Sequence, residues 1–216
     1  RRRQDHGTKR DAVIRTAARA FDERGYHNTS LDDIAAALGV TKPTIYYYVA
    51  NKEQLLFECF LAALEPIRAA LRRAEQTPGS GRDRLHEVIH DYAVAIASEY
   101  GWCMVRAEHQ DLGAELGAQV RSLKSEIDRG IRRLLQGGIN DGSIAVTAPT
   151  LAAFAIAGAL NWIAHWYRAG RTLTSDEVAT ALVQFLDHGL APREPRAGKP
   201  LPATARVRRT RSATSA

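Results

Sequence analysis

Apolar residues recur at three- and four-residue intervals along most of this chain, and this helical period restricts the possible folds more than any other feature of the sequence. The first such stripe consists of Val13, Ile14, Ala17, Ala20 and Phe21. No segment alternates between apolar and polar residues as a half-buried strand does, and none repeats with the period of a solenoid. The sequence therefore predicts an all-α fold.

Residues that start and stop helices divide the chain into elements. Ser30 and Asp33 are spaced as a capping box before a short helix that Gly39 ends, and a second short helix is expected over residues 42–48. Asn51 is expected to cap a long helix that continues to about residue 75, with Gln54 as its reciprocal partner. Further helices are expected over residues 82–99, 102–110, 113–136, 147–168 and 175–189.

The composition is that of a soluble globular protein, with 45% hydrophobic and 25% charged residues. No apolar run approaches the roughly 18 residues of a membrane span, and the basic N-terminus lacks the apolar stretch of a secretory signal. Cys59 and Cys103 lie in apolar helical surroundings, which indicates buried free thiols in a reducing compartment. We therefore expect a cytoplasmic protein with no membrane partner.

Charge is distributed unevenly along the chain. Residues 1–52 carry ten Lys and Arg against six Asp and Glu, a net charge of +4, whereas residues 53–190 carry thirteen against seventeen, a net charge of −4. Residues 191–216 carry seven against one and hold four of the eight prolines, which is typical of a disordered basic tail. A basic end on an acidic body indicates a polyanionic partner at that end.

Residues 30–48 have the spacing of a helix-turn-helix, whose second helix enters the major groove of DNA. Three consecutive tyrosines follow in that helix, and because neighbouring residues point about 100° apart, they cannot all share a buried face. Lys52, at the start of the next helix, is placed as a phosphate clamp. The expected DNA-binding residues are Ser30, Thr41, Lys42, Pro43, Thr44, Tyr46, Tyr47, Tyr48 and Lys52. The alternative is that the tyrosines only complete the core of a small three-helix unit.

Residues 9–55 resemble the DNA-binding domain of TetR-family transcriptional regulators. The matching residues are Phe21, Gly25, Tyr26, Thr29 and Ser30, then residues 34–40, then residues 44–55. Tyr48 stands where the family usually has a phosphate-contacting histidine, and a phenol can donate a hydrogen bond there but cannot carry positive charge. The resemblance implies a homodimeric repressor or activator that binds operator DNA and has a helical domain for ligand binding and dimerisation.

The expected organisation has four parts. Residues 1–8 form a basic N-terminal arm that tracks DNA, and residues 9–52 form the helix-turn-helix domain. Residues 53–190 form the effector-binding and dimerisation domain, and residues 191–216 form the disordered basic tail.

The segment 151–170 is apolar nearly all round and contains small residues that permit close approach of another helix. In the TetR family the last two helices build a four-helix dimer interface. The expected interface residues are Ala155, Gly158, Ala159, Trp162, Trp166, Leu182 and Phe185. The alternative is that this segment is buried within one monomer.

A second resemblance concerns the effector. Trp162, Trp166, Tyr167, Arg168, Gly170 and Leu173 match a signature found in TetR-family members that respond to acyl-CoA thioesters. This sequence departs from the signature at Ala169 and Arg171. The alternative is that the signature reflects the fold and not the ligand. We expect a small hydrophobic effector, with an acyl-CoA as the class that the signature implies, and no cofactor. Its pocket is expected between the helices at 82–99, 102–110 and 113–136, lined by Tyr92, Trp102, Arg106 and Glu108.

The segment "HEVIH" at residues 86–90 raises a competing hypothesis, because two histidines one helical turn apart with a glutamate are typical of zinc hydrolases. The apolar stripe of this helix places His86 and His90 on its flank rather than in a cleft, and no strand is present to bind an extended substrate. We therefore expect no enzymatic activity and no metal, and keep a zinc-dependent hydrolase as the less favoured alternative.

Overall fold

The computed structural model describes the backbone of residues 2–107 and 111–191, and the side chains of this part from residue 9 onward. Every regular element in these ranges is a helix, which confirms the all-α prediction. Residues 192–216 of the expected basic tail lie outside the described residues. The helix α1 begins at Arg2, so the segment expected to be an arm belongs to its first turns.

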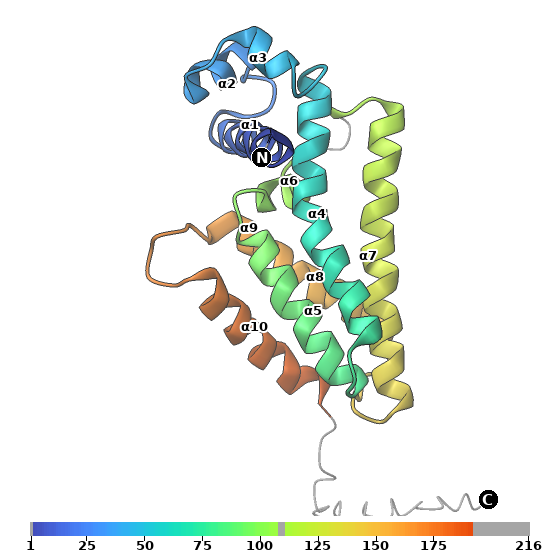
Figure 1. The fold of residues 1–216 in the computed structure, drawn as a ribbon. Helices are drawn as coiled ribbons and strands as arrows, with labels where there is room; N and C mark the ends of the chain where they lie inside the picture. Colours follow the sequence, from blue (N-terminus) through green and yellow to red (C-terminus); the bar gives the residue numbers. More distant parts are fainter. Residues whose placement is uncertain (1, 108–110, 192–216) are drawn as a thin grey trace, which may run out of the picture.

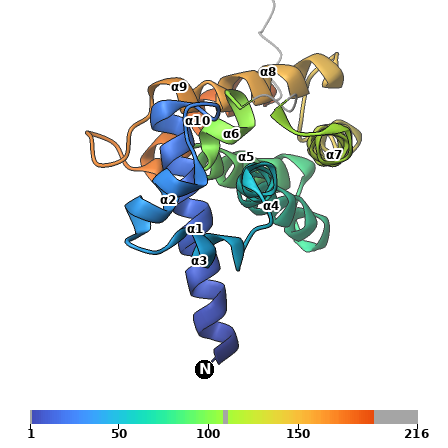
Figure 2. The same ribbon diagram turned by 90° about the horizontal axis from the view of Figure 1, so that it is seen from above.

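The first three helices, α1 (Arg2–Arg24), α2 (Leu31–Leu38) and α3 (Lys42–Tyr46), lie together at one end of the molecule (Figure 1). The long helix α4 (Lys52–Gln76) runs from this end along the body. The body also contains α5 (Gly81–Ile96), α6 (Gly101–Val105) and α7 (Ala114–Asn140). Seen from above, α4 and α7 are viewed nearly end-on, so their axes run close to parallel (Figure 2).

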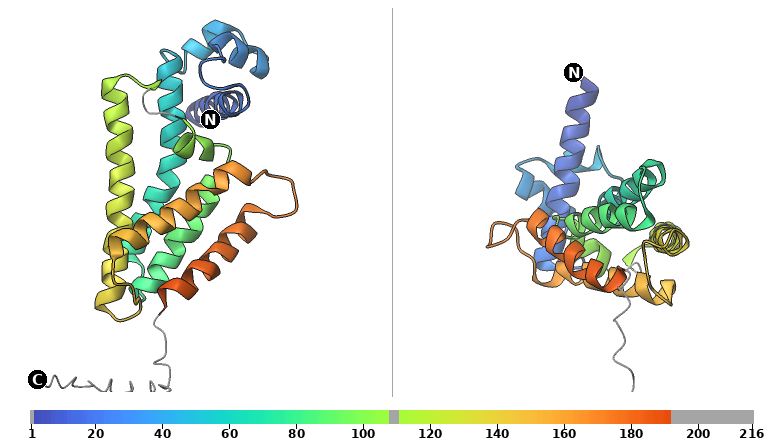
Figure 3. Two further views of the ribbon diagram at one scale, coloured as in Figure 1. Left: turned by 180° about the vertical axis from the view of Figure 1, so that it is seen from behind. Right: turned by 90° about the horizontal axis from the view of Figure 1, so that it is seen from below.

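The last three helices cover one side of the body. They are α8 (Pro149–Asn161), α9 (Ile163–Trp166) and α10 (Ser175–Leu190). Views from behind and from below place α8 and α10 on the same outer side (Figure 3). No helix in the described part of the chain is long and apolar enough to cross a membrane.

Side-chain caps fix where several helices begin. The Ser30 side chain accepts a hydrogen bond from the Asp33 N–H, while the Asp33 carboxylate accepts one from the Ser30 N–H at 2.7 Å, as predicted. Asn51 caps α4 by accepting from the Gln54 N–H at 2.7 Å, but the Gln54 amide oxygen accepts from the Ala50 N–H instead of that of Asn51. Gly39 ends α2 with φ at 65°, in the left-handed region where glycine is favoured.

Several predicted boundaries are wrong, including the end of the helix expected over 102–110, which stops at Val105, and packing explains one of them. The pattern predicts a turn over residues 136–143, yet α7 continues to Asn140 through Gly137 and Gly138. A Cβ on Gly138 would lie 2.4 Å from the Ile144 side chain, so this glycine serves a close contact and not a turn. The helix expected over 147–168 is interrupted at Trp162, where the His165 N–H donates to the Trp162 carbonyl three residues back, at 3.0 Å.

Candidate DNA-binding surface and effector pocket

The helix α3 is anchored by its apolar residues and presents its polar ones outward. Ile45 and, just after the helix, Val49 are buried in the core, as predicted. Pro43 lies in the first turn, where its fixed φ suits a helix start. The Thr41 and Thr44 hydroxyls lie 3.0 Å apart. This short helix is therefore held firmly on one side while its other side is open to a partner.

The three tyrosines divide between the surface and the core. Tyr46 is 49% exposed and Tyr47 is 71% exposed, whereas Tyr48 is partly buried against the core. The Tyr47 and Tyr48 rings meet edge to face with centroids 5.2 Å apart. Side chains that complete a core are buried, whereas Tyr46 and Tyr47 are exposed. The alternative that the tyrosines only complete the core of a three-helix unit therefore does not account for these two residues.

Lys52 and Lys42 are both engaged by side chains of the same end of the molecule. The Lys52 Nζ lies 4.2 Å from the centroid of the Tyr26 ring. Burial lowers the pKa of Lys52, and the negative charge of Asp111 partly opposes this shift. Lys42 forms an ion pair with Asp32 at 2.6 Å, and the hydrogen bond to this carboxylate raises the pKa of Lys42. Both lysines therefore present positive charge beside α3.

Four of the expected DNA-binding residues share one surface hollow of about 470 Å³, namely Ser30, Lys42, Tyr46 and Lys52. The Ser30 hydroxyl is already used by the capping box. The hollow lies between α2 and α4 and is lined by two lysines and an exposed phenol, groups that donate hydrogen bonds to phosphate oxygens, and also by the carboxylates of Asp32 and Asp33. This arrangement suits contact with a nucleic-acid backbone.

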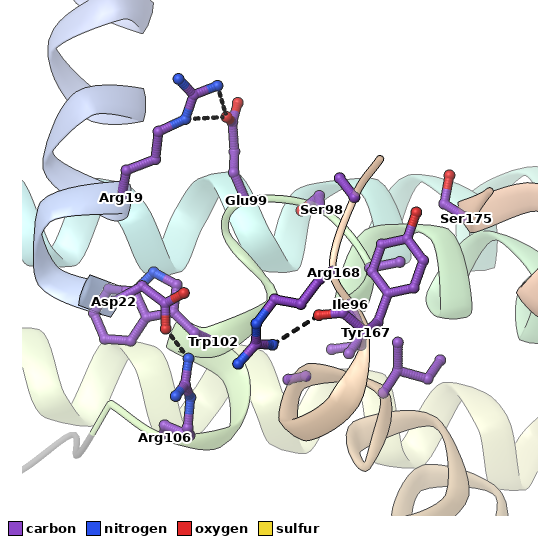
Figure 4. Close-up of a pocket in the computed structure, with 14 residues that line it drawn as sticks. Arg19, Asp22, Ile96, Ser98, Glu99, Trp102, Arg106, Tyr167, Arg168 and Ser175 are labelled. Carbon is purple, nitrogen blue, oxygen red and sulfur yellow. Dashed lines mark hydrogen bonds and ion pairs between the residues drawn. The ribbon is translucent and has the colours of Figure 1, made fainter. Parts of the chain in front are cut away.

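A second cavity, of about 450 Å³, lies where α1 meets the body (Figure 4). Its lining comes from α1, the end of α5 and the α5–α6 connection, α6 and Arg106 just after it, α9 and the segment after it, and the start of α10. Two of the residues expected at the effector site, Trp102 and Arg106, line this cavity, together with Arg19, Asp22, Tyr167 and Arg168. The sequence analysis missed Arg19 and Asp22, because nothing in the pattern of α1 shows which body residues it will face.

This cavity does not lie between α5, α6 and α7, where the effector pocket was expected. The Lys124 side chain extends into that region. Its Nζ donates to the Met104 carbonyl at 3.0 Å and lies 5.3 Å from the Phe60 ring centroid. Tyr92 does not line the cavity: it is buried, its hydroxyl donates to the Asn161 side chain at 3.1 Å, and burial raises its pKa to about 12. Glu108 lies outside the described residues.

Arginines dominate the polar lining of this cavity. Arg106 forms an ion pair with Asp22, and Arg19 donates to the Glu99 carboxylate at 2.8 and 3.0 Å. Arg168 donates to the Tyr167 carbonyl at 2.7 Å. Burial, and then the nearby charge of Arg168, lower the pKa of Arg106. Three guanidinium groups against two carboxylates make the cavity suited to an anion.

The two histidines of the "HEVIH" segment contact different carboxylates of α10. His86 Nε2 lies 2.7 Å from Asp187, and His90 Nε2 lies 3.0 Å from Asp176. No group of three or more His, Cys, Asp or Glu able to hold a metal occurs in the described part of the chain. The two histidines therefore connect α5 to α10 through these contacts. This arrangement does not support the zinc-hydrolase alternative.

Large exposed apolar side chains gather on α8–α10 and the loop between α9 and α10. Of the nine such side chains among the described residues, six belong to this region: Leu151, Phe154, Trp162, Trp166, Leu173 and Phe185. Trp162 is 62% exposed and Phe185 is 74% exposed. An apolar groove of about 500 Å³, lined by residues of α8 and α10, crosses the same face. Burial within one monomer, the alternative interpretation of residues 151–170, does not describe these side chains.

Two family profiles match the chain. Residues 13–59 match the family described as bacterial regulatory proteins, tetR family, and residues 78–190 match the tetracyclin repressor-like C-terminal domain.

Individual relatives agree with these matches. The HTH-type transcriptional repressor KstR2 of Rhodococcus jostii is 28% identical over 189 residues, which cover 85% of this chain and 91% of that protein. The HTH-type transcriptional activator FasR of Mycolicibacterium smegmatis is 23% identical over 184 residues, which cover 85% and 83%. Among solved structures, AibR in complex with isovaleryl coenzyme A and operator DNA is 28% identical, with a TM-score of 0.69 over 82% of this chain and 96% of that one.

Proposed function

Because this chain belongs to the TetR family of bacterial regulatory proteins, we propose that it is a homodimeric transcriptional repressor that a small amphipathic anion releases from operator DNA. In this proposal, residues 9–52 bind the operator, and residues 53–190 bind the effector and the partner subunit. KstR2 supports repression, since that relative is a repressor, whereas FasR is an activator and is less similar.

The observation that carries the DNA-binding part is the division of α3 into an anchored and an open side. Ile45 is buried while Tyr46 and Tyr47 are exposed, and the helix lies at the free end of the molecule (Figure 1). Phenols and lysines beside such a helix donate hydrogen bonds to phosphates, which fix its position in the groove. Pro43 and the Thr44 methyl are the apolar groups that a thymine methyl would meet.

The effector class rests on the lining of the cavity. Tyr167 and Arg168, which belong to the signature associated with acyl-CoA response, line it together with Arg106. A coenzyme A thioester combines phosphates with an apolar acyl chain, and the cavity offers guanidinium groups beside Ile96 and Ile163. AibR, which was solved with isovaleryl coenzyme A and operator DNA, supports this class of effector.

The dimer is proposed through the apolar face of α8–α10. The expected interface residues Trp162, Trp166 and Phe185 are exposed there, and a Cβ on Gly158 would meet nothing within 4 Å of its own chain. An exposed apolar patch rimmed by polar residues is typical of an interaction site. Two such faces brought together would bury these side chains and hold two reading helices at a fixed separation.

Selection of operator DNA tests the proposal as a whole. Purified protein is used to enrich binding sites from random duplexes, and the enriched site is placed across a promoter for transcription in vitro. We expect a two-fold symmetric site and reduced transcript with added protein. Enrichment of no site would contradict the DNA-binding role, and increased transcript would show an activator instead.

A further inference from the structure

We propose that Arg106 forms an anion-binding subsite of the cavity which the Asp22 carboxylate fills when no effector is bound, and that an anionic group of the effector takes Arg106 from Asp22. This inference rests on the proposed function, and it adds the chemistry that the effector must carry and the way in which its binding reaches the DNA-binding end.

The two partners of this ion pair come from different parts of the chain. Asp22 is in α1, close to its end, and Arg106 follows α6 in the body. Within the described part of the chain, each has only the other as an ion-pair partner. The pair therefore joins the DNA-binding end to the body through a single carboxylate, which has the same chemistry as an anionic ligand.

The charge around the pair is unbalanced. Arg168 lines the same cavity, and its described polar contact is with the Tyr167 carbonyl, an uncharged acceptor. Burial lowers the pKa of Arg106, and the charge of Arg168, which lines the same cavity, lowers it further. One Asp22 carboxylate does not neutralise both, and a phosphate or carboxylate on a ligand would reach the two together.

A buried donor in the same lining lacks an acceptor. The Trp102 indole Nε1–H is buried and has no hydrogen-bond partner, although the residue lines the cavity. Figure 4 shows Trp102 next to the Asp22–Arg106 pair, with Arg168 extending into the same space.

Exchange of the Arg106 partner would loosen α1. Asp22 follows Phe21, whose ring packs edge-on against Trp102 with centroids 6.2 Å apart. When the ligand anion holds Arg106, the end of α1 loses one of its charged ties to the body, while Arg15 and Arg19 remain paired with Glu99 further along the helix. The last turn of α1 and the helices that it supports can then shift. Operator DNA favours the tied state, so ligand and DNA weaken each other reciprocally.

Inorganic pyrophosphate tests the subsite without any assumption about the effector, with tryptophan fluorescence or calorimetry as the readout. Asp22→Asn removes the competing carboxylate and should tighten pyrophosphate binding about 2- to 5-fold. This factor corresponds to the free energy that a partly exposed ion pair contributes. Glu23→Gln is the matched control, because it removes the same charge from the next residue, which has no ion pair within the described residues. Arg106→Gln should abolish the binding. Equal affinity in Asp22→Asn and Glu23→Gln, or undiminished binding in Arg106→Gln, would overturn the proposal.

An acyl-CoA and the N-acetylcysteamine thioester of the same acyl chain separate this inference from the proposed function. We expect the acyl-CoA to release operator DNA from the wild-type protein and the phosphate-free analogue to have no effect. In Asp22→Asn, the factor by which the acyl-CoA lowers operator affinity should be about 2- to 5-fold smaller than in the wild type. Release that is equal in Asp22→Asn and wild type would leave the repressor standing and refute the exchange. Pyrophosphate binding that follows the predicted order without any acyl-CoA response would retain the subsite and refute the effector class.

Discussion

The Trp102 indole packs edge-on against the Phe21 ring, with 6.2 Å between their centroids, and so joins the cavity between α1 and the body to the first helix. Phe21 in turn meets Tyr26 at 5.2 Å, and the Lys52 Nζ lies 4.2 Å from the Tyr26 ring centroid. A continuous row of packed side chains therefore connects the pocket to a residue beside the reading helix. Such a row transmits an effect only if both ends bias the same two arrangements, and the effect of an effector on operator affinity measures this property.

Lys52→Ala should weaken operator binding about equally for all DNA sequences, because a phosphate contact carries no sequence information. The slope of log affinity against log salt should become shallower by about 0.9 for each phosphate that the variant no longer neutralises. Fluorescence anisotropy over a salt series gives this slope. Arg133→Ala, which removes a positive charge at an exposed site on α7 paired with Glu75, should leave the slope unchanged. Equal slopes in the two variants would remove Lys52 from the DNA contacts.

Tyr47→Phe should weaken operator binding by about 0.5–1.5 kcal/mol, the typical net contribution of one hydrogen bond, with no change in thermal stability. The ring is 71% exposed, so loss of its hydroxyl leaves the core intact. Ile45→Val should instead affect the fold. Because Ile45 is fully buried, this substitution should lower folding stability by about 0.5–1.5 kcal/mol. If Tyr47→Phe binds the operator like wild type, its phenol does not contact DNA.

Gly158→Leu should dissociate the dimer without destabilising the monomer fold. A Cβ at this position meets nothing within 4 Å of its own chain, so any cost arises from the partner subunit. Overpacking of a close helix contact typically costs about 1–3 kcal/mol. Sedimentation at micromolar concentration should show a monomer–dimer equilibrium shifted towards monomer, with operator affinity reduced in parallel. A wild-type protein that sediments as a monomer would refute this interface.

Acid should weaken the helix caps and so lower the stability of the protein. The hydroxyl and N–H groups of Ser30, Ser80 and Thr174 donate to Asp33, Asp83 and Glu177, and these hydrogen bonds lower the pKa of each carboxylate. Since the folded pKa is below the unfolded value of about 4, the stabilisation is complete above about pH 4 and is lost as pH falls through the folded values.

Thermal melts between pH 7 and pH 2 measure this contribution. Asp83→Asn should flatten the decline of Tm below about pH 4, because the variant has one fewer carboxylate to protonate. Glu87→Gln, on the same helix but outside the capping box, is the control. An equal decline in Asp83→Asn and wild type would show that this cap does not contribute to acid sensitivity.

Local signals in the sequence were enough to predict the DNA-binding end. Ser30, Gly39 and Asn51 act on the backbone within a few residues, so their effect on helix boundaries could be predicted without knowledge of the fold. The burial of Ile45 beside exposed Tyr46 and Tyr47 follows from the helical period in the same way. The helical state of Gly138 depends on its close contact with Ile144, which the local pattern did not reveal. The local pattern also gave no signal for the interruption at Trp162.

The pocket depended on contacts between distant segments. Trp102 and Arg106 were predicted because they lie on a central helix, whereas Asp22 lies about 80 residues away in α1 and enters through the docking of α1 on the body. Tyr92 belongs to the apolar stripe of its helix, and this position alone does not show whether a residue lines a pocket or is buried in the core, where Tyr92 lies. Tyr167 and Arg168 were visible only as a family signature, and the structure adds that they line the cavity with Arg106.

Operator affinity of the wild-type protein with and without saturated acyl-CoAs of increasing chain length tests the central claim most directly. Fluorescence anisotropy on the selected operator gives both values under one set of salt conditions. The account predicts that a medium- or long-chain acyl-CoA lowers operator affinity roughly 5- to 150-fold, the range of typical coupling energies, and that operator DNA weakens binding of the same acyl-CoA by an equal factor. An operator affinity that no acyl-CoA in the series changes would contradict it.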